Sequence, residues 1–169
     1  LAGAGTAGDV LTSDAAGNAQ WKPKAVAFEA SILSQVNVSA TSSKIVFDIE
    51  TLDEGGNNFD HTNSEFTAPH SGIYSIQVAV AFEVTGTATD NVIELALMKG
   101  GTPTPIKKVS VTMESVNSGA RKSGVISATI RLAQNDTLHV EAIDFGGGGN
   151  IAILTAEGSW FSGHLVYAY

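Results

Sequence analysis

Cysteine is absent from the 169 residues of this chain, which excludes disulfide bonds, thiolate nucleophiles and cysteine-based zinc sites. Only 15% of the residues are charged, and the formal net charge is -8. This negative balance argues against binding nucleic acid through its phosphates and against docking on an anionic membrane surface. No apolar run reaches the roughly 18 residues that a membrane-spanning segment requires, so we expect no membrane insertion. Because the chain begins with Leu1 and carries no signal-peptide pattern, we expect it to be part of a longer protein.

Basic residues are missing from one long stretch of the chain. Between Ile45 and Met98 there are nine acidic residues and no Lys or Arg, whereas Lys99 to Arg131 holds six basic residues and one acid. In an oligomer, blocks of opposite charge can face each other across subunits and fix the register of assembly. They can equally be two ordinary solvated faces, and the sequence leaves both interpretations open.

The residues that are abundant are typical of β structure, with Val, Ile, Thr and Ser frequent and 18 glycines among the turns. No helical periodicity extends beyond a single turn. Alternation of apolar and polar residues, interrupted by turn signals, predicts strands over residues 25–33, 44–50, 72–84, 91–99, 106–116, 122–132, 136–145 and 159–169. Eight or more strands at this spacing indicate an all-β antiparallel sandwich, for which a jelly roll is the natural closure.

The chain divides into two unequal parts. Residues 1–23 are rich in Gly and Ala, with Trp21 as a large apolar residue near their end, and they are too poor in apolar surface to fold alone. We interpret them as a connector that folds only against other copies or against the main domain. Their "GAGTAG" matches the G-x-G-x-x-G pattern of dinucleotide-binding proteins. That pattern binds a dinucleotide only between a strand and a helix, and no such elements are predicted here, so we attribute the match to the Gly/Ala-rich composition. Residues 24–169 are predicted to form one globular domain.

Two stretches of the main domain resemble the signature of the complement C1q globular head, a family that shares its jelly roll with tumour necrosis factor. The first is "FDIETLDEGGNNFDHTNSEFTAPHSGIYSI", and the second is the closing "SWFSGHLVYAY"; "AVAFEASIL" resembles the family's opening strand. The residues that carry the match are Phe47, Asp53, Phe59, Phe66, Gly72, Tyr74, Phe161, Gly163 and Leu165. One extra residue lies between Asp53 and Phe59, in a turn where insertions are tolerated.

The resemblance implies a ten-stranded antiparallel jelly roll that assembles as a homotrimer, caps a stalk and binds a partner with its outer surface. It assigns the signature residues to the core and not to a binding site. Gly72 is expected to permit a close backbone approach as a Pro-containing loop enters a long strand. Tyr74 is expected to bury its large apolar ring while its hydroxyl stays hydrogen-bonded near an interface.

The connector is similar to a short unit found ahead of terminal domains in bacteriophage tail and fibre proteins and in some bacterial surface proteins. The matching stretch is "GTAGDVLTSDAAGNAQWKP". Its matching residues are Val10, Leu11, Thr12, Ser13, Asp14, Gly17 and Trp21. A stalk-end unit followed by a trimeric head indicates the tip of a fibre, on a virion or at an extracellular or cell surface.

Ligand contacts are expected from loops on a rigid scaffold, namely residues 53–60, 85–90, 100–105 and 145–150. The candidate ligand-facing residues in them are Asn57, Asn58, Asp60, His61, Thr87, Asp90, Thr102 and Asn150. Calcium is a weak hypothesis for Asp53, Glu54 and Asp60, since carboxylates around a glycine turn suit a hard cation. No other metal and no cofactor is expected.

No sequence pattern pairs a nucleophile with a base, so we expect a protein that is not an enzyme. The sequence favours a trimeric fibre-tip head that attaches to a glycan or protein receptor on a host surface. Two alternatives remain: a trimerisation cap that binds no receptor, and a secreted C1q-like ligand. Homotrimerisation, and hence self-association, is common to all three.

Overall fold

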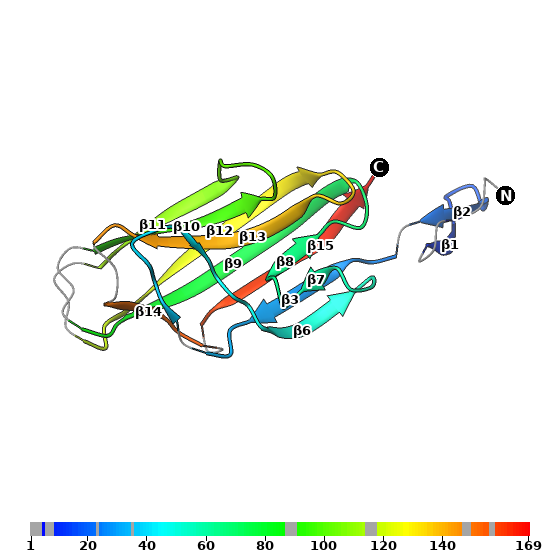
Figure 1. Cartoon of the computed structure of the whole chain (residues 1–169). Coiled ribbons are helices and arrows are strands. Elements are labelled where there is room, and N and C mark those ends of the chain that lie inside the picture. The colour runs from blue at the N-terminus through cyan, green and yellow to red at the C-terminus, as the bar shows by residue number, and fades with distance from the viewer. Residues whose placement is uncertain are drawn as a thin grey trace.

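A computed structural model of the chain describes residues 5, 9–22, 24–34, 36–86, 91–113, 118–146, 150–155 and 158–169. Every regular element in these segments is a β-strand, so the prediction of an all-β protein is confirmed. The described residues include no helix that could span a membrane. Two antiparallel sheets form a sandwich, and a separate hairpin precedes it (Figure 1).

The first sheet is six-stranded. In spatial order it contains β11 (Lys107–Met113), β10 (Asn91–Lys99), β13 (Thr137–Asp144), β8 (Glu65–Thr67) and β7 (Phe59–Asp60), with β5 (Ser43–Lys44) paired to β13. The long strands β10, β11 and β13 correspond to three strands that alternation predicted. The short strands β5, β7 and β8 arise where irregular connections run briefly beside a neighbour.

The second sheet is seven-stranded. In spatial order it contains β4 (Val36–Asn37), β14 (Ile151–Ile153), β9 (Gly72–Val84), β15 (Trp160–Ala168), β3 (Ala27–Ser31) and β6 (Ile49–Glu54), with β12 (Arg121–Leu132) paired to β9. The 13-residue β9 is the central strand of this sheet. β12 pairs along one edge of β9, and β15 and β14 pair with successive parts of its other edge. The two sheets together contain more than the ten strands expected, because several strands are only two or three residues long.

The predicted strand over residues 44–50 is wrong in its middle, because residues 45–48 cross from β5 in one sheet to β6 in the other. Ile45 and Phe47 are buried while Val46 is exposed, which imitates a strand in the sequence. Their backbone groups are satisfied individually: Ile45 N donates to Val140 O at 2.8 Å, and Phe47 N donates to Ser64 Oγ at 2.8 Å. A segment that crosses between sheets can therefore show the alternating burial of a strand without forming a continuous ladder of backbone hydrogen bonds.

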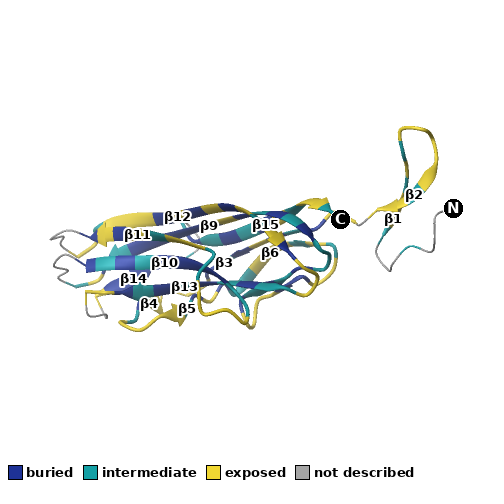
Figure 2. Cartoon of the chain, turned by 90° about the horizontal axis from the view of Figure 1, so that it is seen from above, coloured by how far each residue is buried: buried dark blue, intermediate teal, exposed yellow. Residues whose placement is uncertain are grey.

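Residues 10–22 form a hairpin that the sequence did not indicate. Its strands β1 (Val10–Ser13) and β2 (Ala19–Lys22) pair only with each other, and the hairpin projects away from the sandwich (Figure 2). The Asp14 carboxylate closes the turn by accepting from the backbone N–H groups of Ala16 and Asn18 and from the Asn18 amide. These hydrogen bonds, the one from the Asn18 amide first, hold the pKa of Asp14 below its usual value.

The core between the sheets is centred on Phe28, which is fully buried in β3. Its ring stacks on Phe66 at 4.4 Å and on Phe59 at 5.4 Å, and meets Phe161 edge-on at 4.9 Å. Phe47 in turn packs against Phe161, with ring centroids 5.7 Å apart. Aromatic residues of both C1q-like signature stretches thus pack around Phe28, which lies in the stretch that resembles the family's opening strand.

Replacing Phe28 with Ala should lower the free energy of unfolding by about 3–5 kcal/mol, because the cavity would leave three rings without their shared partner. The measurement is urea unfolding followed by tryptophan fluorescence. Phe145→Ala is the matched control, since the same change at a side chain that is 62% exposed should cost little. Equal losses for the two variants would contradict the central position of Phe28.

Candidate functional site

Gly72 and Tyr74 serve the packing of the sandwich. A Cβ atom on Gly72 would lie 2.5 Å from the Tyr167 carbonyl oxygen and 2.7 Å from Leu165 Cδ1, so only glycine lets β9 begin beside the end of β15. Tyr74 is fully buried, and its hydroxyl donates to the His70 carbonyl oxygen at 2.8 Å. Burial raises the pKa of Tyr74 above its usual value, opposed by this hydrogen bond.

The remaining signature residues are equally internal. A Cβ on Gly163 would lie 2.5 Å from Ile76 Cδ1 and 2.7 Å from Phe28 Cε1, so the ring of Phe28 occupies the space that any other residue would need. Leu165 is partly buried against the core. The Asp53 carboxylate accepts from the backbone N–H groups of Asn58 at 2.7 Å and Phe59 at 3.2 Å. It thereby closes the glycine turn in which the extra residue lies.

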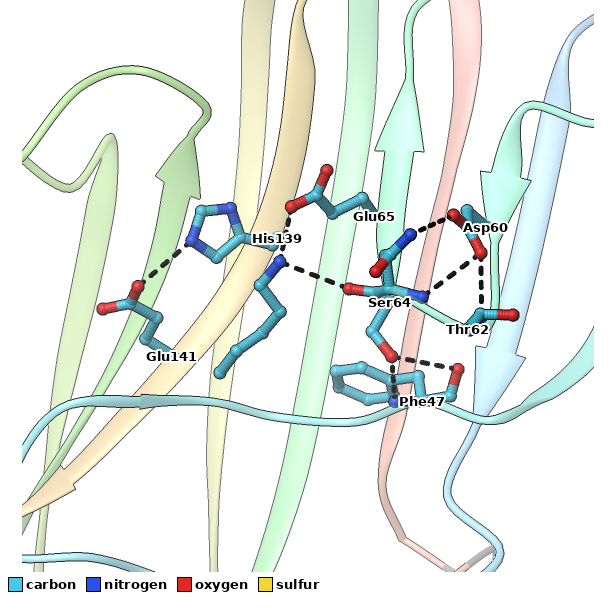
Figure 3. Close-up of polar contacts among 9 residues, drawn as sticks. Phe47, Asp60, Thr62, Ser64, Glu65, His139 and Glu141 are labelled. Atoms are coloured by element: carbon cyan, nitrogen blue, oxygen red, sulfur yellow. Dashed lines mark hydrogen bonds and ion pairs between the residues drawn. The ribbon is translucent and has the colours of Figure 1, made fainter.

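Two of the candidate ligand-facing residues near this turn are occupied by structural hydrogen bonds. Asn58 is only 4% exposed, and its amide donates to Asp53 and to the Glu54 carbonyl oxygen. Asp60 accepts from the Asn63 amide at 2.6 Å and from backbone N–H groups that include Thr62 at 2.9 Å (Figure 3). These bonds, the Asn63 amide first, lower the pKa of Asp60.

Asn57 and His61 remain exposed and line a hollow of about 650 Å³ with Asp48 and Glu50. His61 Nδ1 lies 3.9 Å from a Glu50 carboxylate oxygen, while Asp48 accepts a hydrogen bond from the Leu33 backbone N–H. The acids of this hollow are thus partly used by the chain itself, while Asn57 and His61 remain exposed beside them.

The calcium hypothesis gains no support from the geometry. Asp53 and Asp60 each bind backbone N–H groups, and Glu54 faces Lys24 at 3.9 Å. Among the described residues, no three His, Asp or Glu side chains are close enough together to hold a metal ion. A carboxylate that already accepts backbone donors has fewer lone pairs left for a cation.

The described residues of the four candidate loops lie at opposite ends of the sandwich. We call the end with Ala27, Gly72 and Ala168 the terminal end, and the end with Val84 and Asn91 the distal end. Residues 53–60 reach the terminal end, where Gly55 approaches the Ala25 carbonyl oxygen. The loop that contains Thr102 is at the same end, since Gly100 N bonds to Thr137 O, beside the backbone that pairs with β8.

Asn150 belongs to the distal end, where its carbonyl oxygen accepts from Thr85 N at 2.8 Å. Two further candidate residues, Thr87 and Asp90, lie outside the described residues. Residues 145–150 form one of the predicted candidate loops, but the sequence did not single out Phe145, which is 62% exposed directly after β13. Its only signal was an aromatic residue between an alternating strand and a run of glycines.

Two buried polar side chains, those of Asn91 and Asp144, hold the backbone next to Phe145. The Asn91 amide donates to Asp144 Oδ2 at 3.0 Å, and both residues are at least 96% buried. The other oxygen of Asp144 accepts from the backbone N–H of Gly146 at 2.8 Å. Since these bonds fix the backbone on either side of Phe145, its ring is presented from a rigid base.

The outward face of the six-stranded sheet is charged. Lys44 pairs with Glu65, and His139 Nε2 lies 3.1 Å from Glu141 Oε1 (Figure 3). The segregated charge blocks of the sequence also meet here within one chain, since Lys108 pairs with Glu94 at 2.8 Å. At the distal end of the other sheet, Arg121 pairs with Glu83 at 2.5 Å. These pairings favour the interpretation that the charge blocks neutralise each other within one chain.

The outward face of the seven-stranded sheet is uncharged along its centre. Its rows are set by the pairing of β12, β9 and β15, in which Thr129, Ser75 and His164 lie side by side. The outward-facing residues of this centre are Ser75, Gln77, Ala79, Ala81, Ser123, Val125, Ser127, Thr129, Trp160, Ser162 and His164. We call this surface the uncharged face.

Two large apolar side chains stand on the uncharged face. Val125 is 59% exposed, and Trp160 is partly exposed beside a hollow of about 510 Å³ that Gln77 and Ser162 also line. A solvated sheet face ordinarily carries charged and polar residues, as the other sheet of this molecule does. A lack of charged side chains around a partly exposed tryptophan is instead typical of the core of a surface that becomes covered.

The family model described as the C1q domain matches residues 27–166, which include both sheets of the sandwich. The chain belongs to the C1q domain family. Its described segments thus form an all-β jelly roll of the C1q and tumour necrosis factor type. No curated protein sequence matches it.

Solved structures agree in fold at low identity. The globular domain of zebrafish complement 1qA protein is 17% identical, covering 85% of this chain and 99% of that one, with a TM-score of 0.59. The Eiger TNF from S. frugiperda is 13% identical, covering 86% and 95%, with a TM-score of 0.67. Murine APRIL is 12% identical, covering 85% and 100%, with a TM-score of 0.63.

The hydrogen bond between Ser42 and Glu141 on the charged face should stabilise the fold to an extent that depends on pH. A hydrogen bond from Ser42 Oγ, 2.7 Å long, lowers the pKa of Glu141 below its usual value. Partial burial opposes this shift, and His139 and Lys44 add to it. Because the folded pKa is lowered, the stabilisation is complete above the unfolded pKa and is lost as pH falls through the folded one. Ser42→Ala should therefore cost about 1 kcal/mol at pH 7 and markedly less at about pH 3.

Unfolding free energies of the wild type and Ser42→Ala, measured by urea at both pH values, test this. Ser110→Ala is the control, since this exposed serine lies on the same charged face. A Ser42→Ala cost that stays constant between the two pH values would contradict the role given to the ionised carboxylate.

Proposed function

We propose that this chain is a non-enzymatic recognition head that assembles as a homotrimer through its uncharged face and stands at the end of a fibre. The observation that carries the proposal is that face itself. Covering serine, threonine and alanine side chains costs far less than covering ion pairs, and Val125 and Trp160 supply apolar area to offset the cost of association. Membership of the C1q domain family supports self-association through a jelly-roll surface.

The distal end is the surface that such a head would present to its partner. The connector joins the sandwich at the opposite, terminal end, so a fibre would approach from there and leave the distal loops outward. Phe145 and Asn150 combine an exposed ring with an amide, which suits a glycan or a protein surface. Three copies would bind with avidity although each contact is weak.

The phage-like connector supports a place on a virion fibre or a bacterial surface, with a receptor on the host cell. A structural cap without a receptor is the second candidate, and one observation favours it. Candidate ligand residues such as Asn58 and Asp60 are already bound within the chain. A secreted C1q-like ligand would share the assembly but not the fibre.

Placing a charge on the uncharged face should break the assembly. Val125→Arg would bury an unpaired cation in each of three contacts, so the trimer should dissociate to monomers at concentrations about 100-fold higher than for the wild type. Light scattering after size exclusion measures this. Ser110→Arg adds the same charge to an exposed position on the opposite sheet and should leave the trimer intact.

A wild-type chain that is monomeric at all concentrations would contradict the trimer. So would a Val125→Arg variant that dissociates no more readily than Ser110→Arg.

The receptor-binding head and the cap differ in what the distal end does. Phe145→Ser combined with Asn150→Ala should lower attachment to host cells at least tenfold while the trimer mass is unchanged, because neither residue belongs to β9, β12 or β15, the strands of the uncharged face. Fluorescent chain and flow cytometry measure attachment, with Thr102→Ala at the terminal end as control. Unchanged attachment, or no attachment by the wild type to any host, would favour the cap.

A further inference from the structure

The connector hairpin carries an apolar face that its own chain leaves uncovered. Leu11 and Trp21 are direct partners across β1 and β2, so their side chains lie on the same side of the hairpin. They are 52% and 39% exposed, although Gly5 lies against the ring of Trp21. An isolated two-stranded hairpin of this size is marginal in water, and its stability therefore depends on something that covers this face.

A second apolar surface lies at the terminal end of the sandwich. Register shifts between Leu165 and Tyr167 where β15 pairs with β9, and the side chains of Val166 and Tyr167 are 57% and 62% exposed. Tyr169 is 61% exposed beside them, and Arg131 stacks over its ring at 5.3 Å. The surface continues the uncharged face, because Tyr167 pairs with Ile73 in the row next to Ser75.

The two surfaces do not close on each other within one chain. Between the hairpin and the end of β15 there is a hollow of about 530 Å³, with Trp21 on one wall and Val166 and Tyr167 on the other. Neither hairpin strand pairs with a strand of the sandwich, and the hairpin stands beyond the terminal end (Figures 1 and 2). Gln20, Lys22 and Lys24 also line this hollow, and Trp21, Val166 and Tyr167 are the large exposed side chains in it against which a further apolar segment can pack.

We propose that the occupant is the hairpin of a second copy of this chain, so that each head receives the Leu11–Trp21 face of its neighbour at the end of β15. The proposal rests on the trimer proposed above. Continuity with the uncharged face favours a copy over an unrelated partner, because assembly through that face places neighbouring β15 ends beside each other. The residues between Lys22 and Ala27 span at most roughly 17 Å, which confines each hairpin to the base of its own assembly.

The arrangement makes the connector a second assembly element and not a passive link. Each copy donates one hairpin and receives one, which is a head-to-tail contact that closes into a ring when the rotation fits. The apolar side chains of the hairpin and of the β15 end then lose their exposure together. Residues that the sequence placed in a separate connector would in this way stabilise the heads.

The test is the double variant Leu11→Ser and Trp21→Ser in the full chain. The concentration at which the trimer dissociates, measured by sedimentation velocity, should rise about tenfold or more, since two large apolar side chains per copy lose their contact. Leu33→Ser is the matched control: Leu33 is 63% exposed and follows the other end of β3, so its loss should leave the dissociation concentration unchanged.

A fluorescence measurement gives a second readout. The emission of Trp21, obtained as the difference between the wild type and Trp21→Phe, should shift to shorter wavelength when the chain is concentrated from monomer to trimer. The inference is overturned if the trimer forms while the double variant dissociates like Leu33→Ser and the Trp21 emission remains that of a solvated indole. A chain that never trimerises would instead overturn the proposed function, and the two failures are thereby distinct.

Discussion

The packing of aromatic rings around Phe28 is the constraint on which the rest of this structure depends. Phe28 lies in the seven-stranded sheet, while Phe66 and Phe59 come from the six-stranded sheet, so their stacked rings join the two layers directly. The rings also fix the backbone around them. Gly163 has to be glycine because the Phe28 ring fills the space above it. Once these contacts are made, β15 lies between β9 and β3, and the surface that we assign to assembly follows from that order.

Much of the sandwich could be predicted because its long strands are also its most regular ones. β9 and β10 begin and end at the predicted residues, since each is a long run rich in apolar residues that is bounded by turn signals. The crossing segment around Phe47 could not be predicted, because burial on alternate sides occurs in a strand and in a chain that passes from sheet to sheet. The hairpin was missed for a different reason: hydrogen bonds to Asp14 close its turn, and they leave little hydrophobic pattern in the sequence.

The candidate surfaces were harder to find than the fold. The uncharged face is made of alternate residues from β9, β12 and β15, which are far apart in the sequence, so no single stretch reveals it. The charge blocks gave a visible signal, but the register places Glu94 two residues from Ala96, the residue opposite Lys108, so that Glu94 and Lys108 share a face and pair within the chain. A sequence shows which residues alternate, and only the register shows which of them share a face.

Assembly and recognition would use separate parts of this molecule, because different internal contacts hold each end of the sandwich. At the distal end, the Asn91–Asp144 pair holds the backbone on both sides of Phe145, so residues above it can change without disturbing the sheets. At the terminal end, Gly72 and Tyr74 fix the start of β9 against β15, where a change would displace the strands of the uncharged face. A head built this way can alter its distal surface while it keeps its assembly, which is what multivalent attachment requires of a scaffold.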